Sequence, residues 1–197
     1  LASRLGELVQ RDPSIAPTAF GEDLARGLGV ITSRAEALTR FLAAYTQLAR
    51  LPAPRMHPVK VSEWVARVAR LEPRVKVQVA PGPDVTIQAD GDQLDQVLIN
   101  LVKNAADAVQ GTEGGVRMRW SVTDGRLSVV VEDDGPGIGQ TANLFVPFYT
   151  TKVGGTGVGL VLSRQIAESH GGSLVLANRA GASAGCEVRL ELPLSRS

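Results

Sequence analysis

Apolar side chains recur at steps of three and four over residues 20–51, which places them along one face of a helix. Arginine, glutamate and threonine separate them. The pattern predicts one long helix that Pro52 and Pro54 end, because proline cannot continue helical hydrogen bonding. The apolar seam consists of Leu24, Leu28, Ile31, Ala35, Leu38, Leu42, Tyr45 and Ala49, widened by Phe41 and Leu48.

A shorter seam of Leu1, Leu5 and Leu8 precedes a segment rich in turn residues, RDPSIAPTAF. Residues 1–54 are therefore predicted to form a helical hairpin with a long second helix. Most of the long seam then lacks a partner within the chain, so we expect a second copy or an upstream segment to cover it. Packing on the globular part is the alternative. Since the chain starts without Met inside this pattern, we expect it to be a fragment of a longer protein.

After a proline-rich linker at residues 52–61, short strands and helices follow one another without strict alternation. This order predicts an α+β fold, a two-layer α/β sandwich with a mixed, largely antiparallel sheet and helices on one face. Ser62 and Asp92 are predicted to cap helices, and Asp124-Gly125 to form a hairpin turn. Strands are predicted at 75–79, 85–89, 116–122, 127–131, 173–178 and 186–192, and helices at 63–71, 92–109 and 157–169.

The overall charge is nearly balanced, with a formal net charge of +1, and aromatic residues make up only 4% of the chain. Nucleic acid is therefore not an expected partner, nor is a membrane surface. The single cysteine, Cys186, permits no internal disulfide and fits a reducing compartment. No apolar run approaches the roughly 18–20 residues of a membrane span. We expect this portion to be cytoplasmic, with any membrane anchor in upstream regions.

Residues 150–160, TTKVGGTGVGL, hold a glycine cluster that leads into a predicted helix. A P-loop is excluded because Lys152 precedes the glycines instead of following them. A dinucleotide fingerprint is disfavoured because the preceding segment is a poor strand, and because the next strand ends in Asn178 and Arg179 in place of an acid. A phosphate-binding loop at a helix N-terminus remains, with a flexible surface loop as the alternative.

A second glycine motif, VEDDGPGIG at residues 131–139, follows a predicted strand. One interpretation is a tight turn and nothing more. The other is a buried carboxylate that accepts a hydrogen bond from an exocyclic amine, beside glycines that admit a flat ring.

The predicted helix at 92–109 carries Asn100 and Asn104, which are four residues apart and project from one face. Asparagine is a poor residue in mid-helix, so the pair indicates a task beyond helix formation. An amide oxygen can ligate Mg²⁺ while phosphate and water oxygens fill the other positions. Two surface asparagines are the alternative.

Taken in order, the segments NLVKN, DDGPG, FVPFYTTK and GGTGVGL resemble the N, G1, F and G2 boxes of the GHKL ATPase superfamily, whose domain has the Bergerat fold. The closest resemblance is to the catalytic domain of two-component sensor histidine kinases, over residues 58–194. Residues 1–52 resemble the end of the first helix, the turn and the second helix of that family's dimerisation domain. We accordingly divide the chain into a truncated dimerisation hairpin, 1–54, and an ATP-binding catalytic domain, 55–197.

The resemblance implies that the chain binds ATP and Mg²⁺. Asp133 would bind the adenine amine, Gly135 and Gly137 would shape the adenine pocket, and Asn104 would ligate Mg²⁺ with Asn100 close to the metal and phosphates.

The remaining implied residues belong to an ATP lid, which Phe145 and Phe148 would anchor and whose glycines would form a phosphate-facing hinge. Asn100, Asn104 and Lys152 are the implied catalytic residues. The residues implied to hold the nucleotide are Asn100, Lys103, Asn104, Asp133, Gly135, Gly137, Ile138, Phe148, Thr151, Lys152, Gly155, Thr156, Gly157, Val158, Gly159 and Leu160.

Two departures from the family pattern stand out. Asp107 occupies a position where many members carry a basic residue, so Lys152 on the lid, or else Lys103, is expected to supply the charge for the phosphates. The phosphoacceptor histidine is also missing, because neither His57 nor His170 lies on a predicted bundle helix. Both are expected to be structural, and the acceptor is expected just before Leu1.

The implied function is that of a sensor histidine kinase. It would transfer the γ-phosphate of Mg-ATP to a histidine on the missing helix, for onward transfer to an aspartate of a response regulator receiver domain. A homodimer through the helical hairpin is expected. The alternatives are a non-catalytic dimerisation or nucleotide-sensing module, to which Asp107 gives some weight, and another GHKL ATPase or serine kinase, which the long helix argues against.

Overall fold

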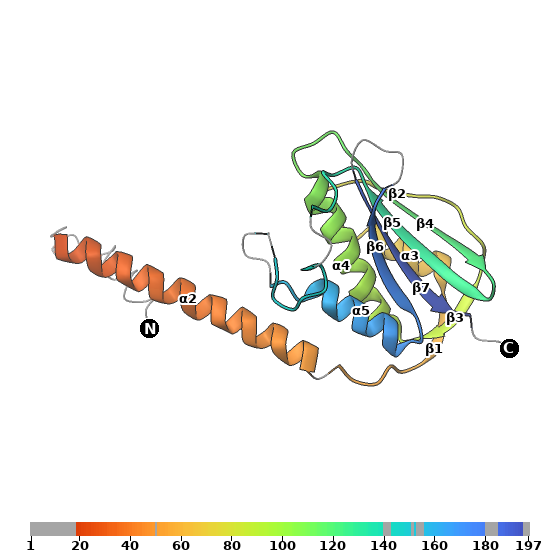
Figure 1. The fold of residues 1–197 in the computed structure, drawn as a ribbon, viewed down its shortest axis with the longest axis horizontal. Helices are drawn as coiled ribbons and strands as arrows, with labels where there is room; N and C mark the ends of the chain where they lie inside the picture. The colour runs from red at the N-terminus through yellow and green to blue at the C-terminus, as the bar shows by residue number, and fades with distance from the viewer. Residues whose placement is uncertain are drawn as a thin grey trace.

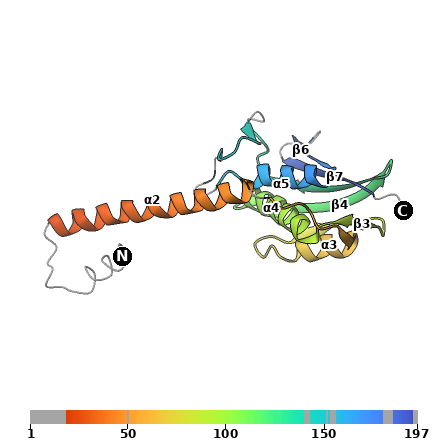
Figure 2. The ribbon, with the colours of Figure 1, turned by 90° about the horizontal axis from the view of Figure 1, so that it is seen from below.

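The computed structural model describes residues 19–49, 51–139, 143–150, 152, 156–179 and 185–194. A long helix, α2 (Ala19–Ala49), projects from an α/β body, as the two perpendicular views in Figure 1 and Figure 2 show. The helices of the body are α3 (Val61–Ala69), α4 (Gly91–Val109) and α5 (Gly159–Ser169). Its strands are β1 (His57–Lys60), β2 (Val77–Val79), β3 (Thr86–Ala89), β4 (Val116–Thr123), β5 (Arg126–Asp133), β6 (Ser173–Asn178) and β7 (Cys186–Pro193).

Five of these strands form one mixed sheet in the order β2-β4-β5-β7-β6. β2 runs parallel to β4, and all other neighbours are antiparallel. The turn between β4 and β5 has positive φ angles at both central residues, 52° at Asp124 and 72° at Gly125, which a two-residue type I′ turn requires. The predicted α+β class, mixed sheet and hairpin turn are therefore confirmed.

The core lies on one face of the sheet. In β4, Val116 and Met118 are buried, while Arg117 and Arg119 point to the opposite face and form ion pairs with Glu132. α4 contacts β4 and β5, α5 contacts β6 and β7, and α3 packs against α4 and β2 (Figure 1). Helices α3, α4 and α5 therefore cover the face of the sheet on which the alternating apolar side chains lie.

The first turn of α4 also holds the chain that arrives from α2. Asp90, and not the predicted Asp92, caps the helix: its Oδ1 accepts from the Gln93 N–H at 3.1 Å, and its Oδ2 accepts from the Arg55 N–H at 2.9 Å. The Gln93 side chain donates to the Pro52 carbonyl at 3.0 Å. One helix cap thus fixes both α4 and the segment that follows α2.

Two other local predictions are wrong. Ser62 does not cap α3, because the helix already begins at Val61 and the capping residue Lys60 makes no side-chain cap hydrogen bond. The predicted linker at 52–61 contains β1, which pairs antiparallel with β3. Pro58 is compatible with this strand because β1 has only one strand neighbour, so a missing N–H can face away from the pairing.

The predicted long helix is confirmed as α2, and most of the seam side chains that the structure describes are exposed. Ile31, Leu38 and Leu42 are each more than half exposed, so most of the surface of these side chains is accessible, although α2 also contacts α5. The helix predicted around Leu1–Leu8 lies outside the described residues. Within the described ranges, no helix combines the length and the apolar character that crossing a membrane needs.

Leu101 tests the packing of α4 on the sheet. Its side chain is 1% exposed, so Leu101→Ala is expected to lower the free energy of unfolding by about 2–5 kcal/mol through lost burial and a cavity. Val175 in β6 is 54% exposed, so Val175→Ala is the control and should change the free energy of unfolding by about 0.5 kcal/mol or less. Urea unfolding measures both, and a loss below about 1 kcal/mol for Leu101→Ala would contradict this packing.

Candidate functional site

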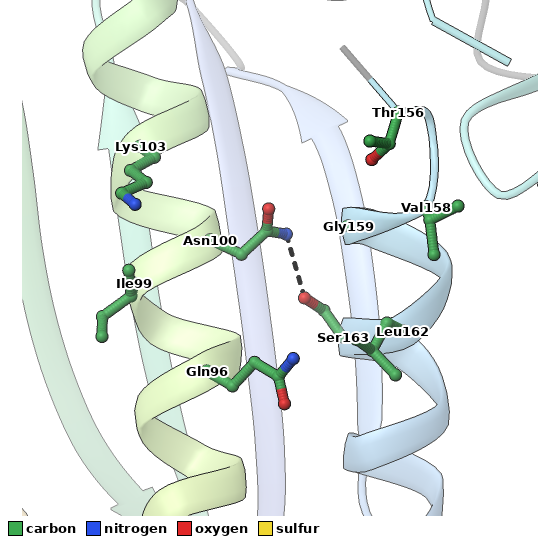
Figure 3. A pocket seen from close by; sticks show the side chains of 9 residues that line it. All are labelled: Gln96, Ile99, Asn100, Lys103, Thr156, Val158, Gly159, Leu162 and Ser163. Atoms are coloured by element: carbon green, nitrogen blue, oxygen red, sulfur yellow. Dashed lines mark hydrogen bonds between the residues drawn. The ribbon is translucent and has the colours of Figure 1, made fainter. Parts of the chain in front are cut away.

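Asn100 lies where α4 meets the start of α5. Its Nδ2 donates to Ser163 Oγ at 3.0 Å, and Figure 3 shows its side chain pointing from α4 towards α5. A Cβ atom at Gly159 would collide with the Asn100 amide oxygen. Glycine at 159 therefore lets the N-terminus of α5 approach α4 closely.

A cavity of about 340 Å³ opens between these two helices, within the size range of small-ligand sites. α5 and the loop before it contribute one wall, and α4 contributes the other (Figure 3). The cavity brings together five of the predicted nucleotide-binding residues. The lining residues are Gln96, Ile99, Asn100, Lys103, Thr156, Val158, Gly159, Leu162 and Ser163.

Asn104, one turn further along α4, accepts a hydrogen bond from the ammonium of Lys152. Lys152 Nζ donates to Asn104 Oδ1 at 2.9 Å and to Asp107 Oδ2 at 2.6 Å. The predicted metal-ligating oxygen therefore faces a positive charge and lies beside a carboxylate. Lys152 is far from α4 in sequence, and this contact joins it to two of the residues that the sequence analysis singled out.

Asp107 binds a second cation that the sequence analysis missed. Arg74 Nη1 donates to Asp107 Oδ1 at 2.6 Å. Burial raises the pKa of Asp107, but the hydrogen bonds from Lys152 and Arg74 outweigh it and hold the pKa below its ordinary value. The acidic residue at this position is thus ionised and neutralised by two cations. Arg74 comes from the connection between α3 and β2, and no motif marks it.

Asp133 ends β5 as a buried carboxylate. Its Oδ1 accepts from the Gly135 N–H at 2.9 Å and from the Cys186 N–H at 3.3 Å, while Oδ2 has no hydrogen-bond partner in the described part of the chain. Burial raises the pKa of Asp133 more than these two donors lower it. Gly135 is required at this turn, because its Cβ would lie 2.7 Å from the Ala108 Cβ on α4.

The pKa of the neighbouring Asp134 is shifted in the opposite direction. Arg117 donates to both of its carboxylate oxygens, at 2.8 and 2.5 Å, and Arg179 Nη1 donates to Oδ1. The hydrogen bonds from Arg117, followed by those from the Gly115 N–H and Arg179, lower the pKa of Asp134 strongly. Two adjacent acids therefore differ, and only Asp133 keeps an oxygen without a partner.

The end of β6 clamps the glycine turn that follows these acids. Asn178 Oδ1 accepts from the Ile138 N–H at 2.6 Å, and its Nδ2 donates to the Ile138 carbonyl at 3.1 Å. Gly137 has a φ angle of +80°, which favours glycine. The polar end of this strand, which weakened the dinucleotide interpretation, thus supports the second glycine motif. No pattern in the sequence predicts that contact.

The F and G2 boxes are tied to each other through their backbones. The Phe148 N–H donates to the Gly157 carbonyl at 3.0 Å, and both residues have positive φ angles. A Cβ at Gly157 would lie 2.5 Å from the Phe148 carbonyl carbon. The Arg164 guanidinium of α5 lies 4.8 Å from the Phe145 ring centroid, which is a cation–π contact. Val158 and Leu160 pack with the core, whereas Thr151 and Gly155 lie outside the described residues.

Neither His57 nor His170 lies on the described bundle helix, α2. His170 is buried at the end of α5, where its Nε2 accepts from the Asp90 N–H at 3.1 Å and its Nδ1 lies 2.8 Å from the Ile166 carbonyl. Because a carbonyl only accepts, the neutral ring with a proton on Nδ1 satisfies both contacts. His57 begins β1. Both positions lie outside α2.

The described residues contain no group of three or more His, Cys, Asp or Glu side chains that could hold a metal ion. A metal here would depend on an amide oxygen and on oxygens from a ligand, a donor set that suits Mg²⁺. Asn104 Oδ1 fits that role, because it already faces a cation beside the Asp107 carboxylate.

Comparison with known proteins identifies the family of the chain. Residues 89–196 match the family described as histidine kinase-, DNA gyrase B- and HSP90-like ATPase. The sensor histidine kinase ZraS of Escherichia coli K12 is 40% identical over 111 residues, or 55% of this chain and 23% of its own length. The chain thus spans about a quarter of that relative.

Solved structures agree with the sequence matches. The catalytic domain of histidine kinase ThkA is 30% identical, with a TM-score of 0.62 over 71% of this chain and 96% of that one. ThkA in complex with the response regulator protein TrrA has a TM-score of 0.69 over 98% of this chain and 60% of that one; at 22% identity, this second likeness concerns the fold. The chain therefore belongs to the histidine kinase-, DNA gyrase B- and HSP90-like ATPase family and contains the ATP-binding catalytic domain of a sensor histidine kinase.

Proposed function

We propose that this chain binds Mg-ATP and transfers its γ-phosphate to a histidine on a dimerisation helix, for onward transfer to an aspartate of a response regulator. The observation that carries the proposal is the spacing along α4. Asn100, Asn104 and Ala108 follow one another at steps of four on one face and contact α5, Lys152 and the Gly135 turn, respectively. They span about 12 Å of helix, which suits a nucleotide lying lengthwise.

The adenine would lie at the Asp133 end of this row. The free Oδ2 of Asp133 is an acceptor for the exocyclic amine, and an acceptor that the bound base covers strongly disfavours a base without that donor. Gly135 and Gly137 leave space beside it for a flat ring, and Asn178 holds this turn in place through Ile138. These contacts support adenine, rather than guanine, as the base.

The phosphates would lie at the other end of the row. The N-terminus of α5 offers backbone N–H groups and the positive end of the helix dipole. Lys103, Thr156, Val158, Gly159 and Leu160 would surround the phosphates from the two helices, with Lys152 supplying positive charge. Mg²⁺, when bound by Asn104 Oδ1, would neutralise charge that develops on the phosphates. The transfer then depends on positioning rather than on a side-chain nucleophile of this chain.

The acceptor histidine and the receiver aspartate would come from elsewhere. His170 is committed to two hydrogen bonds at the end of α5, and His57 belongs to β1. The exposed seam of α2 supports homodimerisation through the helical hairpin, residues 1–54, which would bring an acceptor helix near residues 55–197. The architecture shared with ThkA in its complex with TrrA supports a receiver domain as the partner.

A non-catalytic nucleotide-sensing module is the main alternative. Asp107 was the reason to consider it, because an acid near the phosphates opposes their binding. Its carboxylate is paired with Arg74 and Lys152. The local charge is therefore balanced, and Asp107 does not oppose phosphate binding as an unpaired acid would.

Calorimetry tests nucleotide binding directly. The unmutated chain is expected to bind ATP more tightly with Mg²⁺ than without it. Asn104→Ala should lose that difference, with Mg-ATP binding at least about tenfold weaker, because the metal loses its protein ligand. Gln110→Ala, an exposed polar change at the end of the same helix, is the control. No heat of binding by the unmutated chain would favour the non-catalytic module.

Asp133→Asn should separate stability from binding. Ionised Asp133 is buried at a cost, so its raised pKa means that stability falls as the pH rises through the folded-state pKa. The variant should therefore be more stable at pH 7, and the gain should vanish below about 3.8, the ordinary pKa of Asp. ATP binding should be lost, because the new Nδ2 would face the adenine amine.

Urea unfolding of both proteins at neutral and acid pH measures this difference, since all other titrating groups are shared. Asp134→Asn is the contrasting variant. Its carboxylate has a lowered pKa, so it stabilises above the ordinary pKa and the variant should be less stable at pH 7. An Asp133→Asn variant less stable than the unmutated chain at pH 7 would contradict the assigned burial.

Phosphate labelling tests the acceptor. Incubated with γ-labelled ATP, this chain should bind nucleotide without acquiring label on His57 or His170. The longer protein, containing the upstream helix, should become labelled on a histidine of that helix. Mass spectrometry locates the label, and phosphohistidine at position 57 or 170 would refute the assignment.

A further inference from the structure

We propose that Asp107 is a positioning residue for Lys152, and that Arg74 keeps Asp107 in place while Lys152 leaves Asn104 for the nucleotide phosphates. The inference rests on the proposed function, because it assigns the lysine a task in Mg-ATP binding. It gives a role to the acidic residue that stands where many relatives would be basic, and to an arginine that no motif identifies.

The Lys152 ammonium lies between Asn104 and Asp107 on α4. Lys152 Nζ contacts two oxygens of α4, Asn104 Oδ1 at 2.9 Å and Asp107 Oδ2 at 2.6 Å. Residues three apart lie on the same face of a helix, so one ammonium reaches both. Both contacts have a charged donor, but only the shorter one, to Asp107, is an ion pair, which makes it the stronger of the two. Asp107 therefore contributes most to holding the lysine beside the metal-ligating oxygen.

Mg²⁺ and the Lys152 ammonium would compete for the same amide oxygen of Asn104. A Mg²⁺ ion and an ammonium bound to the same amide oxygen would be close enough to repel each other strongly. Metal binding at Asn104 therefore requires Lys152 to move away from Oδ1. Because Asp107 still attracts the lysine, the displaced ammonium stays near the site, where the nucleotide phosphates become its new acceptors.

Arg74 explains why this exchange leaves no unpaired charge. Its Nε and Nη2 donate to the two oxygens of Glu72, at 2.7 and 2.8 Å, and its Nη1 donates to Asp107 Oδ1 at 2.6 Å. Glu72 is buried, so the guanidinium is fixed by a bidentate pair. When Lys152 turns to the phosphates, Asp107 retains Arg74, and its carboxylate does not become an orphaned charge.

Charge repulsion by Asp107 and positioning of Lys152 by Asp107 predict opposite changes in Mg-ATP affinity when the acid is removed. Simple charge repulsion predicts that removing the acid strengthens the binding of a polyanion. Positioning through Lys152 predicts that removing it weakens the binding, because the lysine is no longer held near the phosphates. The sign of the change in affinity for Mg-ATP therefore decides between them.

The experiment is a double-mutant cycle on the 197-residue chain, with affinity measured by calorimetry. Asp107→Asn is expected to weaken Mg-ATP binding about fivefold to tenfold. Lys152→Met should weaken it at least as much. The double variant should bind no more weakly than Lys152→Met, because Asp107 acts through the lysine. Arg74→Met should produce a smaller loss in the presence of Lys152 and none in its absence.

Two further measurements exclude a merely structural effect. Thermal unfolding without nucleotide should show that all variants remain folded, so that the loss of affinity is not a loss of native protein. Asp95→Asn is the matched control, since Asp95 is another α4 carboxylate paired with an arginine, Arg67 at 2.7 Å. It lies about 18 Å along the helix from Asp107 and should leave the affinity unchanged.

Each outcome has one meaning. Tighter binding by Asp107→Asn, or equal effects of this change with and without Lys152, would overturn the positioning role while leaving the proposed function intact. Failure of the unmutated chain to bind Mg-ATP would overturn both. A loss of affinity that disappears in the Lys152→Met background supports the inference.

Discussion

The docking of α4 on the sheet is the constraint on which the site depends. Its apolar residues, from Leu94 to Val109, are buried against β4 and β5, and this burial fixes the rotation of the helix about its axis. With the rotation fixed, Asn100, Asn104 and Ala108 must point towards α5, Lys152 and the glycine turn. A helix with the same residues but a weaker apolar face would not hold these three contacts in line.

Charge is distributed over the site in pairs that differ by environment. Asp133 and Asp134 are adjacent in sequence, yet burial raises the pKa of the first, while Arg117 lowers that of the second. Asp107 is neutralised by two cations from distant segments. Each acid thus has a distinct state that follows from its partners and not from its residue type. Of the oxygens on these three carboxylates, only Asp133 Oδ2 has no hydrogen-bond partner in the described part of the chain.

Sequence patterns predicted the elements with strong periodicity and the site motifs with fixed local spacing. They predicted α2, the β4–β5 turn and the pair on α4, because each signal lies within one element. They missed β1, where prolines obscure a short strand whose partner is distant, and placed two helix caps wrongly, because several polar residues compete at a helix start. Arg74, Asn178 and Arg179 were missed as site residues, since only tertiary contacts bring them to the α4 site or to the glycine turn.

The glycines at 157 and 159 leave room for other parts of the chain as well as for any ligand. A side chain at 159 would displace the Asn100 amide, and one at 157 would strike the Phe148 backbone, whether or not a nucleotide is present. A descendant that lost catalysis but kept its fold would still be selected for glycine at 157, where the backbone φ angle is positive. The G-x-G motif therefore reflects the packing of the fold, and it cannot by itself distinguish a catalytically active protein from an inactive one.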